Sequence, residues 1–293
     1  MAKTGTGEQL GTAEGAVLSR ALHARFAEDP ILDDHWAIEL LPAEVRDRVE
    51  AADGPEGLEP TPGFDASPVF ALGVACLRCA EDAVEQGVEE GIEQYAILGA
   101  GFDTFALRRG DLCPPLAVFE IDHPDVQRLK RERVAAARRE PAATARFVPV
   151  DFETTALAEA LAGSDFEPAR PAVVTWLNTL PYLTREATVA TLRALRRLLA
   201  PGSRLVVNYG ADVPMTPEQI AFLTRLAEVV ASSGEPTRSR WAPDEFEAVL
   251  EREGFAVREH WSESDLTKRY FERRRDGLRP GVPGRIVTAE PIG

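Results

Sequence analysis

The chain has 293 residues, about twice the usual size of a domain, so its length permits one large domain or two small ones. With 44% hydrophobic and 28% charged residues, it has the composition of a folded soluble protein, which excludes disorder of the whole chain. The net charge of −15 argues against a nucleic-acid partner and against docking on anionic lipid. We expect no membrane span and no signal peptide, and three cysteines are too few for a disulfide framework. These features favour a cytoplasmic location.

The first part of the chain predicts a small helical cap that follows a mobile tail. Residues 1–15 are polar and glycine-rich, so we expect them to form the tail. Apolar residues recur at helical spacing through residues 16–49, which predicts two short helices. Residues 53–68 are rich in proline and glycine and therefore predict a loop. We place the N-terminal cap at residues 16–68.

From residue 67 onward, helical patterns alternate with short apolar runs. A helix is expected to begin at Ser67 as its N-cap, with Pro68 at the first position. We expect helices at 67–86, 125–139, 185–199 (capped by Thr184) and 243–253, with a helical hairpin or lid at 217–230. We expect strands at 94–98, 116–121, 146–150, 172–177, 204–209, 255–261 and 285–288. This alternation predicts an α/β fold, with a mostly parallel sheet covered by helices on both faces.

The first expected strand ends in a loop with two glycines, Gly99-Ala100-Gly101, followed by Asp103. Ligands of open α/β sheets bind beyond the carboxyl ends of the strands, and glycine lets a ligand approach the backbone closely. A phosphate-binding loop would need a following Lys-Ser/Thr, which is absent. A dinucleotide site would favour a third glycine where Thr104 stands. A loop that binds S-adenosylmethionine needs only the two glycines.

Acidic residues follow the second and third expected strands. Asp122 can accept hydrogen bonds from both ribose hydroxyls, and Glu120 on the same strand face would repel the 2′-phosphate of NADP. Asp151 can accept from the exocyclic amine of adenine, while the backbone N–H of Phe152 reaches a ring nitrogen. The alternative is that both aspartates are helix-capping acids, Asp122 just ahead of Pro124. Together these positions describe an adenosine site without phosphates, as S-adenosylmethionine requires.

Four motifs give the chain a resemblance to a known family: "ILGAGFDTFALRR", "VFEIDHPDVQRLKRERV", "FVPVDFE" and "WLNTLPYLT". From about Arg20 to the C-terminus it resembles the leucine carboxyl methyltransferase-like, S-adenosylmethionine-dependent methyltransferases. The resemblance implies a single class I methyltransferase (Rossmann-like) domain with a seven-stranded sheet. It would comprise the cap, a cofactor-binding core at 69–211, a lid at 212–240, and the rest of the core at 241–293. The cofactor-binding residues that it implies are Gly99, Ala100, Gly101, Asp103, Asp122, Asp151 and Phe152.

The family also holds the carboxylate of the cofactor with an arginine from the helix before the first strand, and Arg78 matches that residue. Arg78 lies in an almost wholly apolar helical stretch, where a guanidinium needs an anionic partner or a route to water. An ion pair with Asp82, one helical turn further on, is the structural alternative. Some members use an N-terminal basic residue as well; Arg20 and Arg25 both lie near that position, and the sequence favours neither.

The segment after the fourth strand departs from the family. Where the family usually has a glutamate that contacts the amino group of the cofactor, this chain has Asn178. An amide oxygen can still accept from an ammonium group, but the charge pairing is lost. We expect Asn178 and Tyr182 to face both cofactor and substrate and to act by positioning.

Other patterns predict structure and not chemistry. Cys76 and Cys79 form a CxxC, but they lie within an apolar helix and are interpreted as core residues, with redox chemistry as the alternative. The four histidines have no metal-binding spacing, so no metal is expected. The basic run at 268–279 is interpreted as a solvated helix or a substrate-facing loop, with RNA binding as the alternative.

We therefore expect an enzyme that methylates an oxygen of a small-molecule carboxylate with S-adenosylmethionine, for example in natural-product metabolism. A carboxylate is already ionised at pH 7 and needs no general base, which fits a chain without a histidine at any strand end. The alternatives are methylation of a hydroxyl or an amine, methylation of a protein C-terminal carboxylate, and an NAD dehydrogenase. The sequence does not predict an oligomeric state.

Overall fold

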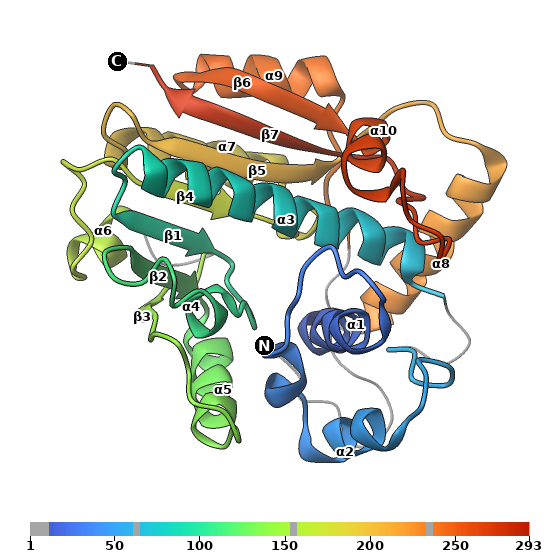
Figure 1. Cartoon of the computed structure of the whole chain (residues 1–293). Coiled ribbons are helices and arrows are strands. Elements are labelled where there is room, and N and C mark those ends of the chain that lie inside the picture. Colours follow the sequence, from blue (N-terminus) through green and yellow to red (C-terminus); the bar gives the residue numbers. More distant parts are fainter. Residues whose placement is uncertain (1–11, 61–64, 153–156, 233–236, 293) are drawn as a thin grey trace.

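The computed structural model describes residues 12–60, 65–152, 157–232 and 237–292 (Figure 1). Its centre is one seven-stranded sheet with the strand order β3-β2-β1-β4-β5-β7-β6. The strands are β1 (Gln94–Leu98), β2 (Ala117–Asp122), β3 (Arg146–Pro149), β4 (Val173–Trp176), β5 (Arg204–Gly210), β6 (Phe255–Ser262) and β7 (Gly284–Pro291). β1 to β5 run parallel, and β7 pairs antiparallel with β5 and β6. The predicted α/β fold with a mostly parallel sheet is confirmed.

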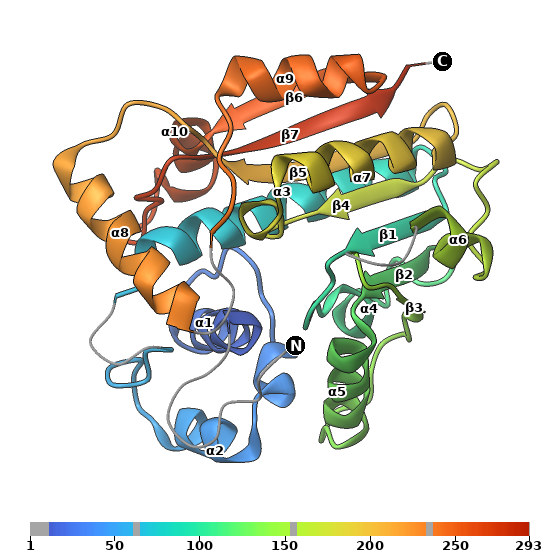
Figure 2. The same ribbon diagram turned by 180° about the vertical axis from the view of Figure 1, so that it is seen from behind.

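Helices cover both faces of this sheet (Figures 1 and 2). The α-helices are α1 (Thr12–Phe26), α2 (Ala43–Ala51), α3 (Ser67–Glu89), α4 (Phe105–Arg108), α5 (Pro124–Ala135), α6 (Leu157–Ala162), α7 (Arg185–Leu198), α8 (Pro217–Ser232), α9 (Pro243–Arg252) and α10 (Glu263–Leu266). The other helical turns are the 3-10 helices η1 (Ala37–Leu40) and η2 (Leu180–Tyr182) and the π-helix η3 (Thr267–Phe271). No described helix is both long enough and apolar enough to span a membrane.

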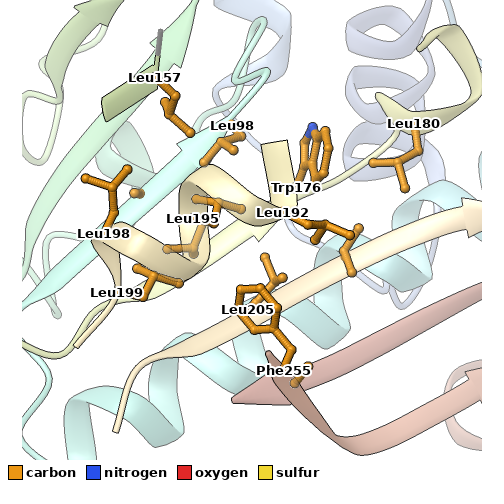
Figure 3. Packing of buried hydrophobic residues seen from close by; sticks show 14 of the residues in the cluster. Leu98, Leu157, Trp176, Leu180, Leu192, Leu195, Leu198, Leu199, Leu205 and Phe255 are labelled. Carbon is orange, nitrogen blue, oxygen red and sulfur yellow. The ribbon is translucent and has the colours of Figure 1, made fainter. Parts of the chain in front are cut away.

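The sheet is buried on both faces, and most residues of its central strands are apolar. All five residues of β1 are buried. Ala96 and Leu98 belong to the cluster beneath α6, α7 and α9, whereas Tyr95 and Ile97 pack toward α3 and α4. Figure 3 shows the first cluster, in which leucines of α7 interlock with Trp176 and with Phe255. A strand buried on both faces reads as a continuous apolar run, which is why the sequence located β1 correctly.

The N-terminal cap packs against the carboxyl ends of β1 and β2. Its apolar cluster combines α1, η1 and α2 with Phe102 of the loop after β1 and with Leu107 of α4. On the other side of the cap, α8 lies beside α1 and the first turns of α3 (Figure 2), where Phe222 and Leu223 pack. The cap and α8 therefore flank the edge at which the parallel strands end.

Several predicted boundaries differ from the structure. α1 begins at Thr12, so the last four residues of the predicted tail are helical, and the preceding eleven lie outside the described residues. Ser67 is the first residue of α3, and the N-cap is Ala66, so no side chain caps this helix. The short helices α4 and α6 were not predicted, because four to six residues carry too little periodicity. Residues 233–236 of the predicted lid lie outside the described residues.

Candidate cofactor site at the carboxyl edge of the sheet

The loop after β1 is shaped by two glycines with positive φ. Gly99 has φ +66° and Gly101 has φ +51°, values that side-chain-bearing residues rarely adopt. A Cβ at Gly99 would lie 2.6 Å from Oγ1 of Thr179, which shows that the loops after β1 and β4 touch. A Cβ at Gly101 would meet nothing within 4 Å. Gly99 is therefore required for packing, whereas Gly101 leaves open space above the loop.

Asp103 and Ala100 hold the rest of this loop in place. Asp103 accepts the backbone N–H of Phe105 at 2.7 Å through Oδ1, and its own N–H donates to the carbonyl of Ala100 at 2.8 Å. The N–H of Ala100 in turn donates to the carbonyl of Ile121 at 3.2 Å, next to the end of β2. Ala100 is buried. These two residues shape the loop, and their expected contact with a cofactor stays a prediction.

Asp122 ends β2 directly beside this loop. Its carboxylate accepts the N–H of Gly101 at 2.5 Å and the N–H of His123 at 2.6 Å. Burial raises the pKa of Asp122, although both N–H groups favour its ionised form. The N-cap of α5 is His123, whose Nδ1 accepts from the N–H of Asp125, so the alternative that Asp122 caps this helix is wrong.

Asp151 and Phe152 follow β3, and the end of this strand lies beside Asp122. The N–H of Val150 donates to the backbone carbonyl of Asp122 at 2.9 Å. Asp151 and Phe152 are partly buried, and the ring of Phe152 packs against the main core cluster. The loop after β1 and both strand ends are thus neighbours along one edge, as the sequence predicts for an adenosine site.

Asn178 and Tyr182 continue this edge on the other side of β1. Asn178 is the one non-glycine residue with positive φ (57°) among the described residues. Its side chain is exposed at the end of β4, and it exchanges two hydrogen bonds with Asn208 of β5. Tyr182 ends η2 and is partly buried. Both residues therefore lie at the edge, but the contacts expected of them stay predictions.

Arg78 pairs with two acids of its own helix. Its Nε donates to Asp82 at 2.7 Å, and its Nη2 lies 3.1 Å from both carboxylate oxygens of Glu85. This is the ion pair that the sequence left open as the structural alternative. Arg78 also lines a recess of about 340 Å³ with His35 and Arg108, between α3, α4 and the cap. A ligand carboxylate that enters this recess would have to compete with Asp82 and Glu85.

A buried polar network that the sequence did not predict ties the cap to the glycine loop. Asp34 accepts from Nη1 of Arg20 at 2.8 Å and from Oγ1 of Thr104 at 2.7 Å. Nη2 of Arg20 donates to the carbonyl of Phe102 at 2.7 Å. Arg108, bonded to Thr104, extends the network to Glu81 of α3, and burial raises the pKa of Glu81. The signal in the sequence was Arg20 itself, a charged residue within an apolar helical pattern.

Arg20 and Arg25, which the sequence could not separate, have different surroundings. Arg20 is 8% exposed and reaches the glycine loop. Arg25 lies on the surface, where its Nη2 donates to the carbonyl of Glu50. Only Arg20 is therefore placed to influence the cofactor site.

Glu120, two positions before Asp122, forms a buried ion pair with Lys130 of α5. Burial raises the pKa of Glu120 to about 7, against the opposing attraction of Lys130. Gln127 of the same helix donates to the backbone carbonyls of Glu120 and Val148. The pair therefore anchors α5 beneath the ends of β2 and β3, and Glu120 is part of the core.

The cysteines and histidines behave as structural residues. Cys76 and Cys79 are buried, as predicted, and burial raises their thiol pKa values to about 12 and about 11, which disfavours the reactive thiolate. His23 accepts from the N–H of Ile31, and His260 shares a hydrogen bond with the hydroxyl of Tyr209. Among the described residues, no cluster of three or more potential metal ligands occurs.

The arrangement fits the adenosine end of S-adenosylmethionine. No atom lies within 4 Å of a Cβ built at Gly101, so a ligand can approach the backbone of this loop closely. Next to it, Asp122 keeps acceptor capacity beyond its two backbone partners, since a carboxylate has about four lone-pair sites. Asp151 lies on the neighbouring strand end.

Two solved structures share the fold of this chain. A Thermobifida fusca protein classed with the methyltransferases superposes with a TM-score of 0.58 and 17% identity, covering 97% of this chain and 96% of its own. A DUF574 family protein from Streptomyces avermitilis also gives a TM-score of 0.58, at 18% identity, covering 94% of this chain and 96% of its own. At these identities the likeness shows the fold alone.

Residues 13–196 match the family model of the leucine carboxyl methyltransferases. The chain is 33% identical over 64% of its length to YktD of Bacillus subtilis, and 33% identical over 68% of its length to a Mycolicibacterium smegmatis protein. The names of both relatives place them among the S-adenosyl-L-methionine-dependent methyltransferases. The matches span 62% and 66% of those two relatives. The chain belongs to the leucine carboxyl methyltransferase family, a family of S-adenosylmethionine-dependent methyltransferases.

Proposed function

We propose that this protein transfers the methyl group of S-adenosylmethionine to a carboxylate oxygen of a small molecule. In this proposal Asp122 binds the ribose hydroxyls, and Asp151 with the N–H of Phe152 binds the adenine. The loop Gly99–Asp103 passes beneath the amino-acid end of the cofactor. Arg78 exchanges Asp82 for the cofactor carboxylate, and Tyr182 orients the acceptor. The family and the neighbouring strand ends support this assignment.

The observation that carries the choice of acceptor is that three of the four histidines are engaged by other protein groups. The Nε2 atom of His23 accepts from Ile31, Nδ1 of His123 accepts from Asp125, and Nε2 of His260 faces the hydroxyl of Tyr209. His35 lies exposed on the cap, in the recess beside Arg78. A phenol or an alcohol would need a base, because its pKa lies well above 7. A carboxylate arrives already ionised.

The methyl group of the bound sulfonium is the electrophile in this reaction. What the protein supplies is positioning: it holds the acceptor oxygen in line with the methyl group and excludes water. Such proximity contributes up to about 7–11 kcal/mol to rate enhancement. In this proposal the cap and α8, which flank the edge of the sheet, form the walls of the acceptor pocket.

The test uses tritiated S-adenosylmethionine and a small-molecule extract as the source of acceptors. We expect a labelled product that releases volatile methanol in mild alkali, because methyl esters hydrolyse under these conditions. Single-turnover transfer to that acceptor should stay constant from about pH 6 to 9, since a carboxylate is ionised throughout this range. A rate that rises steeply through pH 7 to 8, with an alkali-stable product, would contradict the proposal and indicate a hydroxyl or amine acceptor.

A further inference from the structure

The side chains of Asn178 and Asn208 hold each other in a defined orientation at the end of β4. Asn208 lies on β5 and is 6% exposed, whereas Asn178 is exposed at the sheet edge. Oδ1 of Asn208 accepts the backbone N–H of Asn178 at 2.6 Å. Nδ2 of Asn208 donates to Oδ1 of Asn178 at 2.9 Å. One buried amide thus binds both the backbone and the side chain of its neighbour.

This pair fixes the direction of both amides. A backbone N–H can only donate, so the atom of Asn208 that faces it must be the oxygen. The other end of Asn208 is then its NH2 group, which requires an acceptor, so the oxygen of Asn178 must face it. The NH2 group of Asn178 is therefore its outward end. Within the described part of the chain, this group has no hydrogen-bond partner.

The position of Asn178 relative to the adenosine site places this NH2 group at the amino-acid end of the cofactor. β4 lies beside β1, and Thr179 touches Gly99. Asp122 and Asp151 lie on the opposite side of β1, where the adenosine is proposed to bind. An adenosine on that side directs the rest of the cofactor across the glycine loop toward β4. Gly73 of α3 lies next to this amide, because a Cβ at Gly73 would lie 3.8 Å from Nδ2 and 3.9 Å from Oδ1 of Asn178.

We infer that Asn208 is a positioning residue that holds Asn178 as a hydrogen-bond donor to a carboxylate at this end of the site. An acidic residue at position 178 would offer acceptors to an ammonium group, whereas the held amide offers two N–H bonds to an anionic oxygen. The carboxylate has two sources, the amino-acid end of the cofactor and the methyl acceptor. The inference rests on the cofactor of the proposed function, and its second source of the carboxylate rests on the proposed acceptor as well.

The inference is tested by calorimetry with three nucleosides: S-adenosylhomocysteine, its deaminated analogue, and its decarboxylated analogue. The decisive variant is Asn208→Asp, which replaces the NH2 group by an acceptor. Asn178 must then turn its own NH2 group toward residue 208 and present its oxygen to the site. We expect this variant to prefer S-adenosylhomocysteine over the deaminated analogue about tenfold more strongly than the wild type does.

The matched control separates this rotation from the added negative charge. Asn178→Gly keeps the positive φ without strain and removes the amide. In the double variant Asn178→Gly/Asn208→Asp, the tenfold gain should vanish if it acts through the amide of Asn178. A gain that persists in the double variant, or no gain in Asn208→Asp alone, would overturn the inference. The inference would also be overturned if the wild type bound S-adenosylhomocysteine more tightly than its deaminated analogue and Asn178→Gly abolished this preference.

The decarboxylated analogue identifies the source of the carboxylate. If Asn178→Gly weakens binding of S-adenosylhomocysteine and its deaminated analogue but not of the decarboxylated one, the cofactor supplies the carboxylate. If Asn208→Asp shows the tenfold gain in preference and Asn178→Gly binds all three nucleosides like the wild type, the methyl acceptor supplies the carboxylate. Wild-type protein that binds none of the three would contradict the proposed function itself, which distinguishes that failure from failure of the inference.

Discussion

At the scale of single residues, the site depends on carboxylates whose partners the structure defines. Asp122 is held by two backbone N–H groups, one from the glycine loop and one from the start of α5. Arg78 is held by acids of its own helix. The two backbone N–H groups orient the carboxylate of Asp122 for a ligand, whereas the acids around Arg78 already occupy its guanidinium. Asp122 is therefore tested by removing it, and Arg78 by removing either the arginine or one of its acids.

For Asp122, we predict that Asp122→Ala weakens binding of S-adenosylhomocysteine by about tenfold or more. The reason is that hydrogen bonds to a charged group contribute roughly 1.5–3 kcal/mol each. The measurement is calorimetry, with circular dichroism to show that the fold is retained. Asp125→Ala is the matched control, because Asp125 lies exposed on α5. Equal affinities in the wild type and the Asp122 variant would exclude Asp122 from the ribose site.

For Arg78, two substitutions should shift affinity in opposite directions. Arg78→Met should weaken binding of S-adenosylhomocysteine, while Asp82→Asn should strengthen it because it removes a competitor for the guanidinium. Neither change should affect the decarboxylated analogue. Arg78→Met should change stability little, since ion pairs between residues one helical turn apart contribute about 0.3–0.5 kcal/mol. If both variants bind all ligands like the wild type, Arg78 has only a structural role.

At the scale of elements, the cap is joined to the cofactor loop by buried charges as well as by apolar packing. Asp34 accepts from Arg20 of α1 and from Thr104, which precedes α4, and it also accepts the N–H of Ala37 in η1. Three elements thus meet at one carboxylate that is 1% exposed. Displacement of this group would move the loop that carries Gly99 and Gly101.

We predict that Asp34→Asn lowers the free energy of unfolding by about 3 kcal/mol, because loss of one partner leaves Arg20 as an uncompensated buried charge. It should also weaken binding of S-adenosylhomocysteine by loosening the loop at Phe102. Urea unfolding and calorimetry measure the two effects. Arg25→Gln serves as the control, since its guanidinium bonds only at the surface. A stable variant with normal affinity would show that the network does not support the loop.

At the scale of the whole molecule, His23 links the cap to the core. Its Nε2 accepts from Ile31, and its ring packs edge-on against Phe70 of α3. Burial, with a further contribution from Arg274, lowers the pKa of His23 from 6.5 to about 4. The unfolded chain therefore binds a proton at His23 more readily than the folded protein does. As a result, the free energy of unfolding decreases as the pH falls below 6.5.

We predict that His23 makes the protein lose about 2 kcal/mol of stability between pH 6.5 and 5, at about 1.36 kcal/mol per pH unit. His23→Gln, whose amide oxygen can still accept from Ile31, should remove this part of the pH dependence. His35→Gln is the control, because His35 is exposed. Urea unfolding at a series of pH values measures the effect, and identical slopes in the wild type and the His23 variant would contradict it.

The sequence by itself determined the order of the strands along the chain and the residues that end them. β1 and β2 are short runs of mostly apolar residues; Gly99 directly follows the first of them, and Asp122 is the last residue of the second. Thr184 was also recognisable as the cap of α7, since its side chain accepts from an N–H three residues later. These features depend on local periodicity and turn chemistry, which are written in consecutive residues.

Only the tertiary structure decided which distant side chains meet. Arg20 contacts the loop at Phe102, and Asn178 contacts Asn208, across separations in the chain that no local pattern encodes. The same holds for Arg78, for which the sequence allowed either a ligand or an ion pair, and the packed helix gives the ion pair. Hydrogen-bond direction at Asn178 likewise depends on which backbone N–H faces Asn208. Burial brings these groups together, and their need for partners away from water then fixes their orientation.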